Sequence, residues 1–210
     1  MLVKTFPDYF GTYKIYEAVK EVLDKNLRKT DTNKVLAQLK HEEAQPENFM
    51  RKLSLVLKRH VHGKRVSSIM MKIKEQISEL MDVEYEPEKI EFQKNGNAVL
   101  KVRVENKTEA MLKFKVGLEQ LDHKNSAIIY NPVKNFTVSR LVKGKIIQAG
   151  KIHTYKFKLK PDIFEINDLY ELKKKNELNL KLGFQVKAEG IDGFKSKTEK
   201  VPVTIYRVRR

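Results

Sequence analysis

The sequence contains no cysteine and no tryptophan, and its nine glycines and six prolines are few for 210 residues. Without cysteine the chain has no disulfides, no thiolate metal ligands and no thiol nucleophile. The glycines are scattered, which excludes a glycine-rich phosphate-binding loop. No apolar run approaches the roughly 20 residues that span a bilayer, and the first twenty residues lack the apolar region of a signal peptide. We therefore expect a folded cytoplasmic protein that does not associate with membranes.

Acidic residues are too few to balance the basic ones. The chain has 43 Lys and Arg against 27 Asp and Glu, which makes its formal net charge +16. Both halves share the excess, since residues 1–82 carry +5 and residues 83–210 carry +11. Such a field attracts polyanions and accelerates their association. The alternative is a solvated surface without a polyanionic partner, as in lysine-rich proteins of thermophiles.

Apolar residues recur with a helical period in four segments before Asp82. Asp31 or Thr32 could cap the second helix, and Pro46 suits the first turn of the third. Gly63 is the natural break between the third and fourth helices. We therefore predict a helical bundle of about four helices over residues 1–82.

After Asp82 the apolar period changes to two, which is typical of antiparallel strands with one buried face. Asn95-Gly96 is a hairpin signal, and Ala149-Gly150 marks a later turn. The clearest alternation covers residues 98–105, 110–118, 153–160, 178–188 and 201–205. We predict an antiparallel β-sandwich of seven to eight strands over residues 83–210, so the fold class is a two-domain α+β protein. In outline the strands resemble an immunoglobulin-like sandwich, without the Cys and Trp of that core.

Residues suited to catalysis are sparse. Only His60-Val61-His62 brings two histidines together, and a metal site would need further ligands from elsewhere in the fold. The acidic residues show no spacing that indicates a general acid and base pair. We therefore expect no enzyme activity, no metal and no cofactor.

The stretch from Asn48 to Lys74 contains no Asp or Glu, although it carries eight Lys and Arg. It spans the third predicted helix, Gly63 and most of the fourth, which is the outline of a helix-turn-helix. In that motif the second helix enters the major groove of DNA, and basic and hydroxyl side chains contact phosphates and bases. The predicted nucleic-acid-binding residues are Arg51, Lys52, Lys58, Arg59, Lys64, Arg65, Ser67, Ser68, Lys72 and Lys74.

Two other interpretations of the basic charge remain open. Many helical hairpins with a glycine turn bind nothing, and lysines on exposed strands also suppress aggregation at sheet edges. The protein could instead be an interaction or assembly adaptor, whose β-sandwich binds a protein partner or a second copy of the chain. Neither the choice between DNA and RNA nor sequence specificity follows from the sequence.

Overall fold

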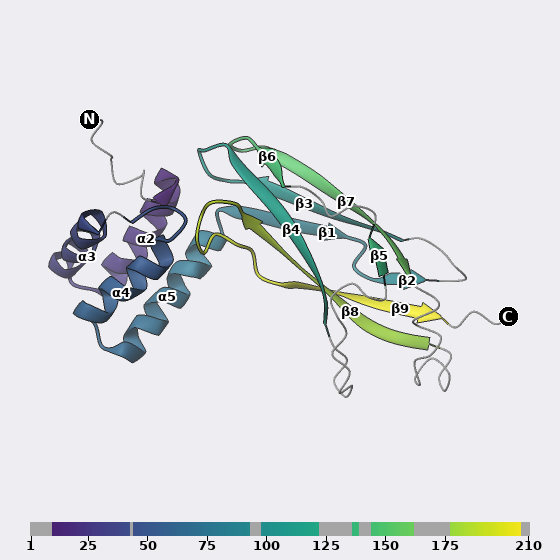
Figure 1. Cartoon of the computed structure of the whole chain (residues 1–210), viewed down its shortest axis with the longest axis horizontal. Helices are drawn as coiled ribbons and strands as arrows, with labels where there is room; N and C mark the ends of the chain where they lie inside the picture. The colour runs from purple at the N-terminus through teal and green to yellow at the C-terminus, as the bar shows by residue number, and fades with distance from the viewer. Residues whose placement is uncertain are drawn as a thin grey trace.

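The computed structural model describes residues 10–42, 44–92, 98–121, 136–138, 144–161 and 177–206. Within these ranges four helices come first along the chain and nine strands follow. Figure 1 shows the helices gathered at one end of an elongated molecule, with the strands extending away from them. The last helix ends at Ser78 and the first strand begins at Met81.

Each of the four helices buries one apolar stripe, and the prediction of four helices is confirmed. The stripe of the last helix, Val66, Ile69, Ile73 and Ile77, is buried along its whole length. At the start of the first, the side chain of Thr12 accepts a hydrogen bond from the Ile15 N–H, a common N-cap arrangement. The helices are α2 (Tyr13–Asn26), α3 (Lys29–His41), α4 (Phe49–His60) and α5 (Gly63–Ser78).

Two helix starts differ from those predicted. Helix α3 begins two residues before Asp31, because the backbone N–H groups of Asp31 and Thr32 both donate to the carbonyl oxygen of Arg28. Helix α4 begins after Pro46, which lies in the preceding turn. That turn is closed by Asn48, whose backbone N–H donates to the Gln45 carbonyl oxygen and whose side chain accepts from the Gln45 N–H.

The break between α4 and α5 falls at Val61 and His62, and Gly63 is the first residue of α5. Both break residues have extended backbone, at φ −140° and −60° respectively. Gly63 is not one of the described glycines that have a positive φ. The prediction that Gly63 is the break is therefore wrong by two residues, since a β-branched residue in extended conformation ends the helix instead.

The strands form two sheets. A four-stranded sheet has the order β1-β3-β7-β5 and a five-stranded sheet the order β2-β9-β8-β4-β6. The strands are β1 (Met81–Glu86), β2 (Ile90–Phe92), β3 (Ala98–Asn106), β4 (Leu112–Leu121), β5 (Phe136–Val138), β6 (Lys145–Ile147), β7 (Ile152–Pro161), β8 (Glu177–Ala188) and β9 (Glu199–Tyr206).

The sheets correct the predicted strand set in number and direction. Nine strands lie in the described residues rather than seven to eight, because β2, β5 and β6 have three residues each and are too short to show alternation. The five-stranded sheet is mixed, since β2 runs parallel to β9. The predicted hairpin turn at Asn95-Gly96 lies outside the described residues and stays a prediction. The described strands nearest to it along the chain, β2 and β3, belong to different sheets.

The alternating pattern correctly identifies the buried face of the longer strands. On β3, Leu100, Val102 and Val104 are fully buried, whereas the residues between them are at least partly exposed. One contact between the two sheets is aromatic: the ring of Tyr85 on β1 meets that of Phe184 on β8 edge to face, with centroids 5.2 Å apart. Such ring pairs stabilise the fold by more than the burial of their apolar area alone.

Two turns of the strand region contact the helices. The carboxylate of Glu109 accepts hydrogen bonds from the backbone N–H groups of Tyr13 and Lys14, which are unpaired donors at the start of α2. Near α4, the Asp192 N–H donates to the Pro46 carbonyl oxygen over 2.8 Å. These contacts place the turn of residues 189–195 beside α4 (Figure 1), where the turn forms one wall of a groove.

Candidate nucleic-acid interface

The ten predicted binding residues all lie on α4 and α5. In Figure 1 the chain runs along α4 away from the strands and returns along α5 toward β1. The two helices present different faces, and the basic side chains are divided among them. The structure therefore does not bring the ten residues together on one surface.

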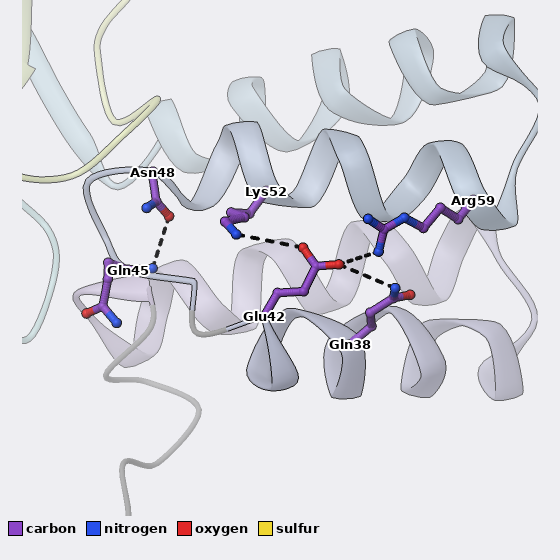
Figure 2. A network of polar contacts seen from close by, with 6 residues as sticks. All are labelled: Gln38, Glu42, Gln45, Asn48, Lys52 and Arg59. Carbon is purple, nitrogen blue, oxygen red and sulfur yellow. Dashed lines mark hydrogen bonds and ion pairs between the residues drawn. The ribbon is translucent and has the colours of Figure 1, made fainter.

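Two of the ten, Lys52 and Arg59, face α3 and contact Glu42. Figure 2 shows the Glu42 carboxylate between them, with Lys52 Nζ 3.9 Å from Oε2 and Arg59 ion-paired to Oε1. The side-chain amide of Gln38 also donates to Glu42 Oε1, over 3.4 Å. This network ties α3 to α4 and partly neutralises both cations. Lys52 and Arg59 therefore have a structural role that needs no nucleic acid.

Two more, Arg65 and Lys72, face the end of α2. The Arg65 guanidinium donates to the backbone carbonyl oxygen of Asn26 at 2.5 Å, and Lys72 Nζ donates to its side-chain oxygen at 2.8 Å. Asn26 is the last residue of α2, where carbonyl groups lack helical partners and the helix dipole favours a cation. These contacts fasten α5 to α2.

Four of the remaining residues line a groove of about 720 Å³ between α4, α5 and the turn of residues 189–195. We call it the helical groove. Its lining residues are Met50, Arg51, Ser54, Lys58, Gly63, Val66, Ser67, Met70, Met71, Lys74, Asp192, Gly193 and Lys195. Lys64 and Ser68 are exposed and are not among them. The structure thus brings together Arg51, Lys58, Ser67 and Lys74.

The groove is strongly cationic. Arg51, Lys58 and Lys74 come from the helices and Lys195 from the strand region, whereas Asp192 supplies the one carboxylate among the described lining residues. That carboxylate accepts a hydrogen bond from the Arg51 backbone N–H over 3.3 Å, which holds the turn against α4. The four cationic side chains that line the groove can therefore contact phosphate groups.

Neutral side chains complete the groove. The hydroxyl groups of Ser54 and Ser67 can donate to phosphate oxygens without adding charge. Met70 and Met71 provide apolar contact, and Met71 is 57% exposed. A mixed lining of this kind suits a ligand with anionic groups on an organic framework better than a free inorganic anion.

Lys195 is a groove residue that is not among the ten predicted from the sequence. It follows the Asp192-Gly193 turn, more than 120 positions after α5 begins, and no local pattern connects the two. The packing of Gly193 against Met50 and the hydrogen bonds of Asp192 bring it to the helices, and a Cβ added to Gly193 would lie 2.5 Å from Met50 Cγ. The basic charge of the strand region is the one signal that could have indicated it.

The histidine pair does not build a metal centre in the described part of the chain. His60 Nε2 lies 2.9 Å from Gln38 Oε1, a partner on α3 rather than a metal ligand. Within the described ranges, no three His, Asp or Glu side chains gather as a metal site would require. In the same ranges, none of the helices combines the length and apolar character needed to cross a bilayer.

No protein-family model and no curated protein matches the sequence. Solved structures resemble part of the chain at low identity. An alpha-2-macroglobulin structure from Escherichia coli matches 60% of the chain at 9% identity and a TM-score of 0.39, and the chain spans 16% of that structure. A FixG-related protein from Vibrio parahaemolyticus matches 61% at 12% identity and a TM-score of 0.37, with 95% of its own length covered.

A PapD-like domain of human CEP192 is a third similar structure. It matches 61% of the chain at 10% identity and a TM-score of 0.34, with 86% of that domain covered. At these TM-scores the likenesses support no conclusion about function, so the candidate site rests on its own geometry.

Proposed function

We propose that the protein binds nucleic acid, with DNA the favoured ligand, through the helical groove. The observation that supports the proposal is the gathering of Arg51, Lys58, Lys74 and Lys195 around one groove, whose described lining includes one carboxylate, that of Asp192. The proposed contacts differ from those of a helix-turn-helix, because four of the basic residues on α4 and α5 are engaged with α2 and α3.

Binding would depend on phosphate contacts and on release of the counterions condensed on the nucleic acid. Each phosphate contact contributes about 0.9 to the slope of log affinity against log salt for duplex DNA, and about 0.7 for a single strand. Four cations in the groove therefore predict a slope of about −3 to −4. Affinity should fall steeply between low and physiological salt.

The test compares two double variants with the same loss of charge. Lys58→Gln with Lys74→Gln removes two groove cations, and Lys29→Gln with Lys34→Gln removes two exposed lysines of α3. Duplex and single-stranded DNA and RNA are titrated by fluorescence anisotropy at two salt concentrations. We expect the groove variant to bind about tenfold or more weakly and the control to bind like the wild type. Equally weakened binding by the two variants would mean that the net charge of the protein, and not the groove, determines affinity. If the wild type binds no nucleic acid at low salt, the proposal is refuted.

A second candidate function is protein interaction at the edge strand β6. Met111 and Ile146 are 64% and 62% exposed, and both lie at the β4–β6 edge, where Ile146 is opposite Lys113. An exposed edge strand with apolar side chains favours pairing with another chain. We propose a second copy of this chain as the partner, which would make the protein a homodimer.

Sedimentation velocity tests that candidate directly. Ile146→Lys places a charge on the exposed edge and replaces no buried side chain. A wild-type dimer that the substitution converts to a monomer would support pairing through β6. A monomeric wild type at all concentrations would exclude it.

We further propose that the chain divides into domains at residues 1–82 and 83–210, that the two sheets form a sandwich, and that the protein is not an enzyme. The aromatic contact of Tyr85 with Phe184 supports the sandwich. Hydrogen exchange on the whole chain tests the division. Two domains predict one opening free energy for the amides of α2–α5 and another for those of the strands.

A further inference from the structure

Three lysines stand side by side across the five-stranded sheet. Lys115 on β4 is directly opposite Lys187 on β8, and Lys187 forms an isolated antiparallel bridge with Lys195. Directly opposed residues point to the same face of a sheet, and all three are exposed. We call these residues the lysine row. Since neighbouring strands lie about 4.8 Å apart, the row is about 10 Å long.

Among the described residues, no carboxylate forms an ion pair with a member of the row. Like charges directly opposite one another on a sheet are destabilising. The acid beside the row, Glu189, is ion-paired with Lys113 at 2.6 Å, and Lys113 is not a member. That hydrogen bond lowers the pKa of the Glu189 carboxyl, and the charges of Lys115 and Lys187 act in the same direction. The Glu189 carboxylate, which is ion-paired with Lys113, therefore cannot by itself neutralise the row.

The lysine row continues from the helical groove. Lys195 lines the groove, and it also lines a hollow of about 440 Å³ on the other side of the turn, together with Lys115 and Lys187. Three carboxylates border this hollow. Glu189 is paired with Lys113 and Asp192 accepts the Arg51 backbone N–H, while Glu47 is the third.

Space for a ligand backbone lies beyond the row. Lys187 borders a shallow hollow of about 300 Å³ on β4 and β8, whose described lining residues include Gly117 and no Asp or Glu. A Cβ added to Gly117 would meet only the Gln185 carbonyl oxygen, at 3.8 Å. A chain lying along the row would therefore meet little steric resistance on this face.

We infer that the ligand is an extended phosphodiester chain that runs from the helical groove across Lys195 and along the lysine row. This rests on the proposed function and adds a length requirement to it. An oligonucleotide of about 4 nucleotides fills the groove only, whereas one of about 16 also reaches Lys187 and Lys115. The row would contribute about two phosphate contacts beyond those in the groove.

The test uses the full chain and the double variant Lys115→Gln with Lys187→Gln, which leaves Lys195 in place. Labelled single strands of about 4 and about 16 nucleotides and a duplex of about 16 base pairs are titrated at several salt concentrations. For the long single strand we expect about tenfold weaker binding and a salt slope smaller by about 1.4, and by about 1.8 for the duplex. Binding of the short strand should not change.

The control variant, Lys156→Gln with Lys158→Gln, removes the same charge from the exposed face of β7 on the other sheet. An unchanged slope for the long ligands in the lysine-row variant, with the groove variant still weakened, overturns this inference and leaves the proposed function standing. Equal effects of control and lysine-row variants also overturn it. If the wild type binds neither length, the proposed function and this inference both fail.

Discussion

The hydroxyl of Tyr155 on β7 donates a buried 2.8 Å hydrogen bond to the carbonyl oxygen of Phe114 on β4, so it connects one sheet to the other. The Tyr155 side chain is 2% exposed. Burial raises the pKa of this hydroxyl to about 12, so it keeps its proton at neutral pH and remains a donor. This hydrogen bond is not part of the backbone hydrogen-bond ladder of either sheet, since β7 and β4 belong to different sheets.

Tyr155→Phe should lower the free energy of unfolding by about 1 kcal/mol, because it removes the donor and keeps the ring in the core. Urea denaturation measures the effect, and the m-value should not change. Tyr13→Phe is the control, since Tyr13 is 49% exposed. Equal stability of the Tyr155 variant and the wild type would mean that the hydrogen bond adds nothing to the packing of the two sheets.

Gly193 is the position where the strand turn meets α4, and its replacement should harm both stability and the helical groove. Its φ is +78°, and an added Cβ would lie 2.5 Å from Met50 Cγ. Gly193→Ala should therefore cost about 2–3 kcal/mol, from backbone strain and displacement of Met50. Gly150→Ala has a similar φ of +65° with nothing within 4 Å, so it should cost only about 1 kcal/mol.

Thermal and urea unfolding of the two glycine variants separate the contact from the strain. Gly193→Ala should also weaken nucleic-acid binding, because Gly193 and Met50 both line the helical groove. Equal losses in the two variants would show that Met50 moves aside freely and that the turn is not held against α4 by this contact.

The apolar periods alone identified the helices and the buried faces of the longer strands. They succeed because each stripe, such as Val66 to Ile77 or Leu100 to Val104, reflects one element packing on one side. Strand partners have no such local signal. The parallel pairing of β2 with β9 joins residues more than 100 positions apart and depends on the packing of the whole chain.

The sequence predicts only part of the candidate site. A stretch that contains no Asp or Glu can still have carboxylates from other elements packed against it in the fold. Glu42 precedes the stretch and neutralises Lys52 and Arg59 from the neighbouring helix. In the same way, Lys195 joins the groove from the far end of the chain. Net charge per segment therefore indicated a basic surface but could not say which side chains form it.

Gly63 offers a test of the corrected helix boundary. It is the first residue of α5 and is not one of the described glycines that have a positive φ. A Cβ added to it would have nothing within 4 Å. Gly63→Ala should raise the free energy of unfolding by about 0.5 kcal/mol, because alanine loses less backbone entropy on folding. Calorimetry measures the shift, and a destabilised variant would contradict the helical assignment of this residue.

The lysine row makes a prediction about stability that needs no ligand. Lys187→Gln removes the middle of three aligned charges and should raise the free energy of unfolding by about 0.3 kcal/mol at low salt. Lys156→Gln is the matched control, since Lys156 is opposite Lys101, which is ion-paired with Glu86 at 2.6 Å. The difference between the variants should disappear at high salt. A less stable Lys187 variant would show that the row is not repulsive.

His153 should make stability depend on pH below neutrality. Its half-buried ring packs edge to face against Tyr155, with centroids 4.8 Å apart, and burial together with the charge of Lys145 lowers its pKa below the ordinary 6.5. The unfolded chain therefore binds a proton near pH 6.5 that the folded chain does not bind until lower pH. The contribution of the neutral ring is complete above pH 6.5 and is lost as the pH falls from 6.5 toward the folded-state value.

Urea unfolding at a series of pH values from 7.5 to 5 measures this loss in the wild type and in His153→Gln. The variant should lose less stability over that range, because it has no group at this position that takes up a proton on unfolding. His41→Gln is the control, since His41 is exposed on α3, and it should follow the wild type. A lost pH dependence in the His41 variant instead would place the titrating group on the helices. In Lys145→Gln part of the wild-type dependence should remain, because burial of His153 is the larger cause of its lowered pKa.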